Sequence, residues 1–262
     1  MAIITFYSYK GGVGRSILLA NTAYLLASKG YNVVCVDFDL EAGGLHSIFS
    51  ITINKVRVTS LQVLLGNRLL TLIDVNNIKI PKGGSIKILP TVSTEGNLVN
   101  ILLESTPSSI MTRMKQVLEQ ISNEFNPDFI LVDSRSGINE VMQALFDKSN
   151  IVTLVLKPNR QNLVGGNAIL DYLSTQKSIL PILVISQVIT EGYEDVLEKF
   201  VQEIEVEGRR NLKPHLIEFD PDLLYNEYLP SVRYASNNKK SYLLKNYEEI
   251  ADTIFRSVMG NQ

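Results

Sequence analysis

The stretch that decides the fold of this chain is residues 2–16, AIITFYSYKGGVGRS. It starts as a β-branched and aromatic run, passes into a glycine loop at residues 10–16, and continues into an apolar helical pattern. A strand, a glycine loop and a helix in this order are the context of a phosphate-binding P-loop. Gly11, Gly12 and Gly14 let the backbone turn tightly and aim N–H groups at a phosphate, beside the positive end of the helix dipole. The loop therefore predicts a phosphate site.

Two positions depart from the common P-loop pattern, GxxxxGK[ST]. Tyr9 stands where that pattern has glycine, and Arg15 stands where it has lysine. Lys10 is an additional cation early in the loop, and Ser16 keeps the hydroxyl that can bind Mg²⁺. On the loop alone, a glycine-rich turn without a ligand remains an alternative to a nucleotide site.

The composition is that of an ordinary globular protein. The 262 residues are 45% apolar and 20% charged, with a net charge of −2, so no whole-molecule field favours DNA or anionic lipid. The single cysteine, Cys35, excludes an internal disulfide and a cysteine metal site within one chain, and its apolar run predicts a buried thiol. Because there is no signal-peptide pattern and no stretch of about 20 apolar residues, we expect a cytoplasmic protein.

The rest of the chain alternates short β-branched runs with helical patterns. Several of the runs are continuously apolar, which is typical of strands buried on both faces of a parallel sheet. We therefore expect one α/β domain over residues 1–262, with a doubly wound, mostly parallel sheet and helices on both faces. The expected strands are 2–7, 32–38, 86–89, 129–132, 151–156, 182–189 and 215–219. The expected helices are 15–29, 110–123, 138–148, 163–176, 193–207 and 242–259.

Two segments need separate comment. Residues 47–106 break the alternation, and we interpret them as loops and small helices beside the C-terminal edge of the sheet. The helix at 242–259 carries an apolar stripe and an acidic polar face, which favours docking on the domain over membrane insertion. The best basic cluster is read as a solvated loop; it consists of Lys239, Lys240 and Lys245.

Four segments, taken together and in order, resemble one known family. They are KGGVG at residues 10–14, VDFDLEAGG at 36–44, FILVDSRSG at 129–137 and LIEFDPDLLYNE at 216–227. The first resembles the deviant Walker A motif of the MinD/ParA ATPases, and the others resemble the paired-aspartate segment, the Walker B strand and the loop beside the base. The resemblance covers nearly the whole chain, and it implies a P-loop NTPase fold that binds ATP and Mg²⁺.

The resemblance also implies catalytic roles. Lys10 matches the signature lysine, which in this family reaches across a dimer to the partner's phosphates. Asp39 matches the residue that positions and polarises the attacking water. Arg15 stands at the phosphate-contacting lysine; its charge and fork suit phosphate, but its different shape predicts slow or partner-dependent hydrolysis.

The expected binding residues follow from the same match. Ser16 would bind Mg²⁺ directly, with Asp133 in the second shell and Asp37 supporting the ion through water. Taken by themselves, Asp37 and Asp39 lie two apart at a strand end, so we expect both carboxylates on one face. The remaining nucleotide contacts are expected from the loop and from two positions near the base, namely Gly11, Gly12, Val13, Gly14, Ile17, Gln187 and Pro221.

A few further positions keep two interpretations. Gly137 is either a γ-phosphate-sensing glycine or a structural turn. Arg160 and Asn162 line either a dimer interface or a solvated loop.

The functional expectation is an ATPase that homodimerises with ATP and Mg²⁺ and so controls a protein effector. The alternative is a nucleotide sensor or scaffold with little hydrolysis, because Arg15 replaces the Walker lysine. A nitrogenase-reductase-like protein would need two cysteines per subunit, and Cys35 stands alone. A bacterial tyrosine kinase would need a C-terminal tyrosine cluster, and here only Tyr242 and Tyr247 stand near the end. DNA or membrane binding is not evident.

Overall fold

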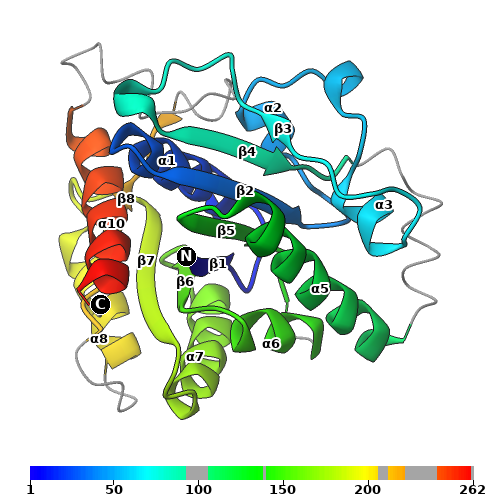
Figure 1. The fold of residues 1–262 in the computed structure, drawn as a ribbon. Helices are drawn as coiled ribbons and strands as arrows, with labels where there is room; N and C mark the ends of the chain where they lie inside the picture. Colours follow the sequence, from blue (N-terminus) through cyan, green and yellow to red (C-terminus); the bar gives the residue numbers. More distant parts are fainter. Residues whose placement is uncertain (93–105, 138–139, 206–211, 222–240, 261–262) are drawn as a thin grey trace.

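The computed structural model describes residues 1–92, 106–137, 140–205, 212–221 and 241–260. Their strands form an eight-stranded sheet with the order β3-β4-β2-β5-β1-β6-β7-β8 (Figure 1). Every strand pair is parallel except β3 with β4, so the sheet is mostly parallel as expected. The strands are β1 Ala2–Tyr7, β2 Asn32–Phe38, β3 Ile73–Asp74, β4 Ser85–Leu89, β5 Phe129–Ser134, β6 Ile151–Leu156, β7 Leu180–Val188 and β8 His215–Glu218.

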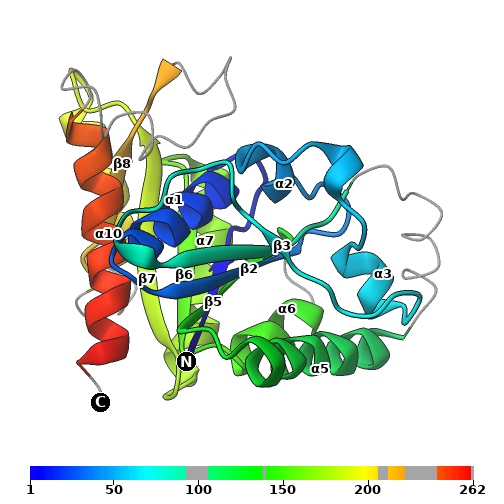
Figure 2. The same cartoon turned by 45° about the horizontal axis from the view of Figure 1, so that its top comes forward.

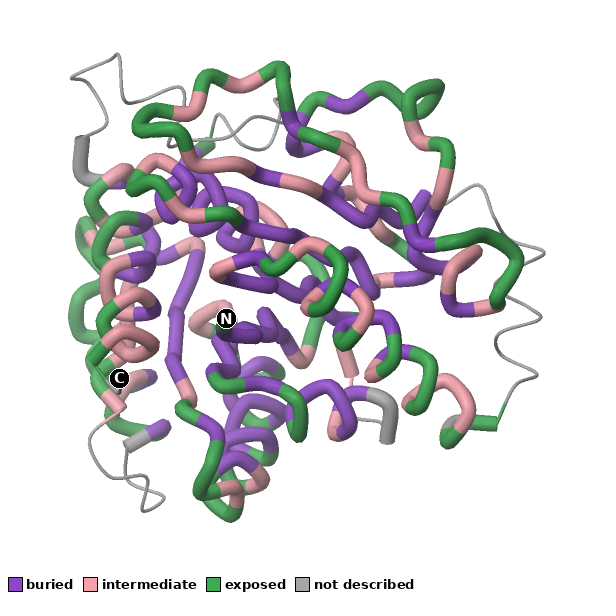
Figure 3. The backbone as a smooth tube through the Cα atoms, viewed as in Figure 1, coloured by how far each residue is buried: buried purple, intermediate pink, exposed green. Residues whose placement is uncertain are grey.

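The continuous apolar runs explain the central strands. β1, β5 and β6 are buried along their whole length, as parallel strands covered by helices on both faces must be (Figure 3). The predicted ranges 2–7, 32–38 and 151–156 coincide with β1, β2 and β6. β5 runs two residues beyond its predicted end because Asp133 and Ser134 still pair with the neighbouring strand β2.

Helices cover both faces of the sheet, in two layers that Figure 2 shows on opposite sides. α1 (Arg15–Ser28), α2 (Leu45–Ile48) and α10 (Ser241–Met259) pack on one face. On the other face, α3 and α5 cover one half of the sheet and α6, α7 and α8 cover the other half. These helices are α3 Ser60–Leu64, α5 Pro107–Phe125, α6 Glu140–Asp147, α7 Arg160–Thr175 and α8 Glu194–Glu205.

The segment predicted as loops and small helices contains one element that the sequence pattern missed. β3 pairs antiparallel with β4 and forms the edge of the sheet. It has only two residues, which is too short to show the alternation that marks a strand. The segment also holds two short 3₁₀ helices, Ile53–Lys55 and Pro81–Gly83, so its description as small helices is otherwise confirmed up to residue 92.

The final helix docks on the domain, as its apolar stripe predicted. Tyr247, Ile250 and Ile254 are buried in the cluster that α10 shares with α1. None of the helices in the described part of the chain is long and apolar enough to cross a membrane. Lys239 and Lys240 of the basic cluster lie outside the described residues.

Candidate functional site

A cavity of about 440 Å³ opens at the carboxyl end of β1, where the order of the strands reverses. Ligands of open α/β sheets bind in the crevice at such a reversal. The lining comes from the glycine loop and from the segments that follow β2 and β5, and it consists of Ser8, residues 11–17, Asp39, Glu41, Ala42, Arg135 and Ser136. The cavity therefore brings together Asp39, Ser16 and the other six predicted residues of the segment 11–17.

The glycine loop has the backbone that the sequence predicted. Gly12 and Gly14 have φ values of +70° and +83°, in the left-handed region that residues with a Cβ rarely adopt. Gly14 is the N-cap of α1, and no side chain caps this helix. The N–H groups of the first turn and the positive end of the dipole therefore remain suited to an anion.

Two side chains of β7 hold the loop by its carbonyl groups. The Ser186 hydroxyl donates to the carbonyl oxygen of Val13 at 2.6 Å. The Gln187 amide donates to the carbonyl oxygen of Gly12 at 3.0 Å. The structure thus places Gln187 against the phosphate loop, and its predicted contact with a base stays a prediction.

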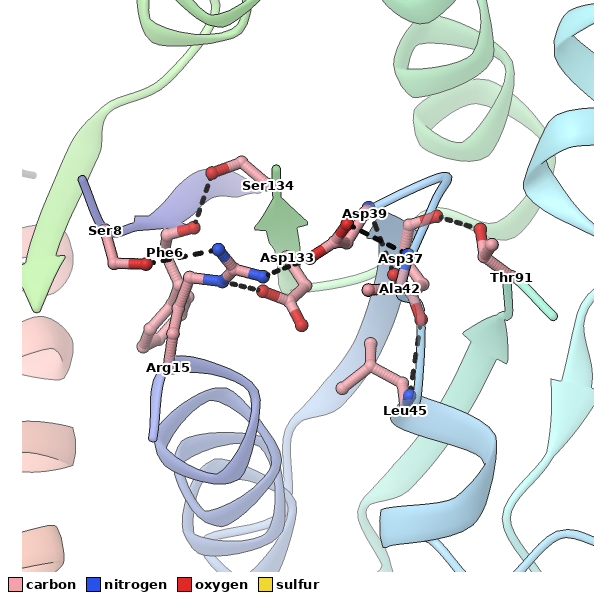
Figure 4. Close-up of polar contacts among 10 residues, drawn as sticks. All are labelled: Phe6, Ser8, Arg15, Asp37, Asp39, Ala42, Leu45, Thr91, Asp133 and Ser134. Atoms are coloured by element: carbon pink, nitrogen blue, oxygen red, sulfur yellow. Dashed lines mark hydrogen bonds and ion pairs between the residues drawn. The ribbon is translucent and has the colours of Figure 1, made fainter. Parts of the chain in front are cut away.

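Arg15, the first residue of α1, is the centre of the polar network (Figure 4). Its Nε donates to the Asp133 carboxylate, its Nη2 donates to Asp39 Oδ2 at 2.8 Å, and its Nη1 donates to Ser8 Oγ at 3.2 Å. The side chains of Arg15 and Asp133 are 7% and 1% exposed. The Arg15 guanidinium is thus bound on three sides, and its charge neutralises two acidic residues of the site, Asp133 and Asp39.

Asp37 has a different environment from Asp39. It is fully buried, and its carboxylate accepts hydrogen bonds from the backbone N–H groups of Asp39 at 3.1 Å and Leu45 at 3.2 Å. The Thr91 hydroxyl donates to the Asp37 carbonyl at 2.8 Å. The sequence predicted that both carboxylates lie on one face of the strand. However, β2 ends at Phe38, so the alternation of its side chains does not continue to Asp39. Of the two aspartates, Asp39 alone lines the cavity.

Burial controls the ionisation of the acidic residues. It raises the pKa of Asp37 well above its ordinary value, and the charge of Asp133, opposite Asp37 in the strand register, raises it further. Burial also raises the pKa of Asp133, although Arg15 and a hydrogen bond from Ser16 act against this. For Arg15, burial lowers the pKa, but the charges of Asp133 and Asp39 outweigh it, so the pKa is raised and the guanidinium stays charged.

Lys10 lies apart from this network. It is exposed, and its Nζ is 5.3 Å from the centre of the Tyr9 ring. The described lining of the cavity includes Gly11 but not Lys10. The Tyr9 ring packs against α7, since a Cβ built on Gly165 would stand 2.1 Å from it. Lys10 is therefore available to a molecule outside the cavity.

The other predicted positions are dispersed. Gly137 has a φ of +91°, which explains glycine there by backbone geometry. Pro221 is exposed just after β8, at the end of a described segment. Arg160 begins α7 and lines a separate cavity between α7 and α8, while the backbone N–H of Asn162 donates to Asn159 Oδ1 at 3.0 Å. No contact of these residues with the phosphate cavity is seen in the described parts.

Reasoning from the sequence missed several residues of the site, among them Arg135, Glu41, Ser8 and Ser186. Arg135 and Glu41 line the cavity and form an ion pair of 2.8 Å, and both stand within segments quoted for the family resemblance. The signal in the sequence that could have found them is a charged residue two positions after each of the aspartates Asp39 and Asp133. Ser8 and Ser186 reach the loop through tertiary contacts, for which the sequence carries no pattern.

Comparison with known proteins agrees with this geometry. A family model described as AAA domain matches residues 1–185. A flagellum site-determining protein of Helicobacter pylori is 29% identical over 68% of this chain and 55% of its own length. The chain spans about half the length of the curated relatives that it matches, 56% of one and 55% of another.

Solved structures share the fold. MinD in the MinC:MinD cell division complex of Aquifex aeolicus superposes with a TM-score of 0.75 and 19% identity, over 97% of this chain and 96% of that one. MinD of Pyrococcus horikoshii, solved with Mg-ADP, superposes with a TM-score of 0.69 and 18% identity over 97% and 95%. At such identities the likeness concerns the fold, whereas the family match covers most of the chain. The chain therefore belongs to the AAA domain family, as a MinD/ParA-like P-loop ATPase.

Proposed function

We propose that this protein binds ATP with Mg²⁺ in the cavity of the glycine loop and homodimerises in response, which controls its binding to a protein effector. The observation that carries the proposal is the convergence on one cavity of an uncapped helix N-terminus, a buried arginine and the Asp39 carboxylate. The first two attract phosphate, and the third can orient a water molecule for attack on it.

The donor set of the cavity fits Mg²⁺. The ion prefers oxygen ligands and keeps several waters, so it needs only one or two protein groups beside the phosphates. Ser16 offers a hydroxyl at the cavity, and its side chain also interacts with the Asp133 carboxylate and lowers the pKa of Asp133. Ser16 would hold the ion, with Asp133 and more remotely Asp37 behind it. The bound ion would neutralise charge on the phosphate oxygens.

Arg15 determines how fast hydrolysis can be. In the structure its guanidinium is bound to Asp133 and to Asp39. Asp39 is the residue proposed to position the attacking water. A phosphate must compete with these carboxylates for the guanidinium. We infer a slow ATPase, in which the cation that binds phosphate also restrains the catalytic aspartate.

The exposed position of Lys10 supports a role across a dimer. It lies outside the cavity of its own chain, where a partner's phosphates could reach it. The solved complex of MinC with MinD, a protein of the same fold, supports a protein partner for the dimer.

Light scattering after size exclusion, in the apo, ADP and ATP states, tests the proposal. We expect the mass to double with ATP and Mg²⁺ and to stay at one chain with ADP. Lys10→Ala should bind ATP but remain a monomer, whereas the exposed Lys245→Ala should behave as the wild type. A mass that is the same in all three states would refute the dimer switch.

Single-turnover hydrolysis separates the ATPase from the alternative of a sensor. Arg15→Lys should hydrolyse ATP faster than the wild type, because lysine cannot bind Asp39, Asp133 and Ser8 together. The sensor would be favoured if the wild type binds ATP but shows no hydrolysis over hours while Arg15→Lys turns it over.

A further inference from the structure

Glu41 and Arg135 form an ion pair at the mouth of the phosphate cavity. Arg135 Nη1 lies 2.8 Å from Glu41 Oε1, and both side chains line the cavity. Glu41 stands two residues after Asp39 and Arg135 two residues after Asp133, on segments that leave the neighbouring strands β2 and β5. The pair therefore links the two acidic segments across the side of the cavity away from β7.

The two arginines of the cavity lining differ in how firmly they are held. Arg15 is buried and binds three polar side chains. Arg135 is 47% exposed, and its partner Glu41 is 41% exposed. An exposed ion pair adds little stability, because water screens it and both long side chains lose freedom. The guanidinium of Arg135 can therefore change partners at low cost, whereas that of Arg15 cannot.

The position of Arg135 also determines which phosphate it could reach. The glycine loop and the first turn of α1 follow β1, and they bind the phosphates nearest to the helix N-terminus. Arg135 and Asp39 lie beyond β1, at the ends of β5 and β2. A phosphate chain that extends from the loop toward Asp39 brings its terminal group to the side of Arg135.

We propose that Arg135 binds the terminal phosphate of the nucleotide from within the same chain, and that Glu41 holds Arg135 when this phosphate is absent. The proposal rests on the proposed function and adds a residue that distinguishes a nucleoside triphosphate from a diphosphate. A guanidinium can bind phosphate oxygens with two parallel hydrogen bonds, which is a stronger contact than the exposed pair with Glu41. Release of Glu41 from Arg135 would also loosen the segment after β2. The terminal phosphate would then act on Asp39 through Glu41, which stands two residues further along this segment.

Calorimetric titration with ADP and with the non-hydrolysable analogue AMPPNP, both with Mg²⁺, tests this role. Arg135→Ala should weaken AMPPNP binding about tenfold or more and change ADP binding less than about twofold. Arg135→Lys should restore part of the loss, because it keeps the charge without the fork. Glu41→Gln should strengthen AMPPNP binding, since it removes the competing carboxylate, and should leave ADP binding unchanged.

Arg256→Ala is the matched control, because it removes the same charge from an 81% exposed position on α10. It should bind both nucleotides as the wild type does. Equal weakening of ADP and AMPPNP in Arg135→Ala, or no weakening of either, would overturn the role of Arg135 while leaving the proposed function intact. Failure of the wild type to bind either nucleotide would instead refute the proposed function and this inference with it. Thermal unfolding of each variant confirms that it is folded.

Discussion

Arg15 and Asp133 form a buried ion pair that joins the first residue of α1 to the carboxyl end of β5. The two residues are 118 positions apart, so the pair ties the phosphate loop to the centre of the sheet. Both charges are removed from water, so the pair adds little stability compared with two well-packed apolar side chains. The loss of only one partner, however, leaves the other charge buried without a counterion. The site is thus a part of the fold as well as a place for a ligand.

Arg15→Ala should destabilise the nucleotide-free protein strongly. Removal of one partner of a buried ion pair costs about 3–5 kcal/mol, because the buried Asp133 carboxyl group, whose pKa burial already raises, loses its counterion. The free energy of unfolding from a urea titration measures the effect, with Arg256→Ala as the exposed control. The double variant Arg15→Ala, Asp133→Ala should lose less stability than the sum of the two single variants. A loss below about 1 kcal/mol in Arg15→Ala would show that the pair does not hold the loop.

Two buried threonines on neighbouring strands should respond to valine in opposite directions. Thr153 Oγ1 on β6 is buried without a hydrogen-bond partner among the described residues, whereas Thr5 Oγ1 on β1 lies 2.7 Å from Ser149 Oγ. Thr153→Val should stabilise the protein by about 1 kcal/mol, because it removes an unpaired buried hydroxyl, and Thr5→Val should destabilise it by about the same amount, because it removes a buried hydrogen bond. Urea unfolding of both variants makes the comparison. The same direction of change in both would contradict it.

Gly165→Ala tests the contact between α7 and the ring of Tyr9. Alanine favours a helix by about 1 kcal/mol over glycine, but its Cβ would lie 2.1 Å from the ring, so we expect a net destabilisation of about 1–3 kcal/mol. Gly44→Ala is the control, since a Cβ there meets nothing within 4 Å. Thermal or urea unfolding measures both. In a Tyr9→Ala background the Gly165→Ala change should no longer destabilise, and a persistent loss would point to another cause.

His215 should make the stability of the protein fall as the medium becomes acidic. Burial lowers the pKa of His215 below its ordinary value of 6.5, and the charge of Lys213 lowers it further, while Glu249 raises it. The unfolded chain therefore binds a proton more readily than the folded one, so this stability is present above pH 6.5 and is lost as the pH falls through the lowered pKa. His215→Gln should flatten the dependence of the unfolding free energy between about pH 5 and 7. An unchanged slope would refute the assignment.

The sequence by itself determined the class of the fold and the position of its phosphate loop. Continuous apolar runs such as 151–156 need helices on both faces, and glycines at 12 and 14 permit the left-handed backbone of the loop. These are local properties, which neighbouring residues in the chain decide. The main errors of prediction also arise because such patterns are local. The two residues of β3 are too few to form a pattern. Asp39 lies one residue beyond the end of its strand, where the alternation of side chains no longer applies.

Only the tertiary structure decided how the charges of the site are paired. The sequence places Arg15, Asp39, Asp133 and Arg135 in three separate segments, but it does not say which arginine binds which carboxylate. The order of the strands places β5 beside β1 and β2 beside β5, so Arg15 contacts the carboxylates of both Asp133 and Asp39, and Arg135 reaches Glu41 at the mouth of the cavity. Such pairings depend on distances between segments remote in the chain and on the loss of water around them, and neither is a property of a local pattern.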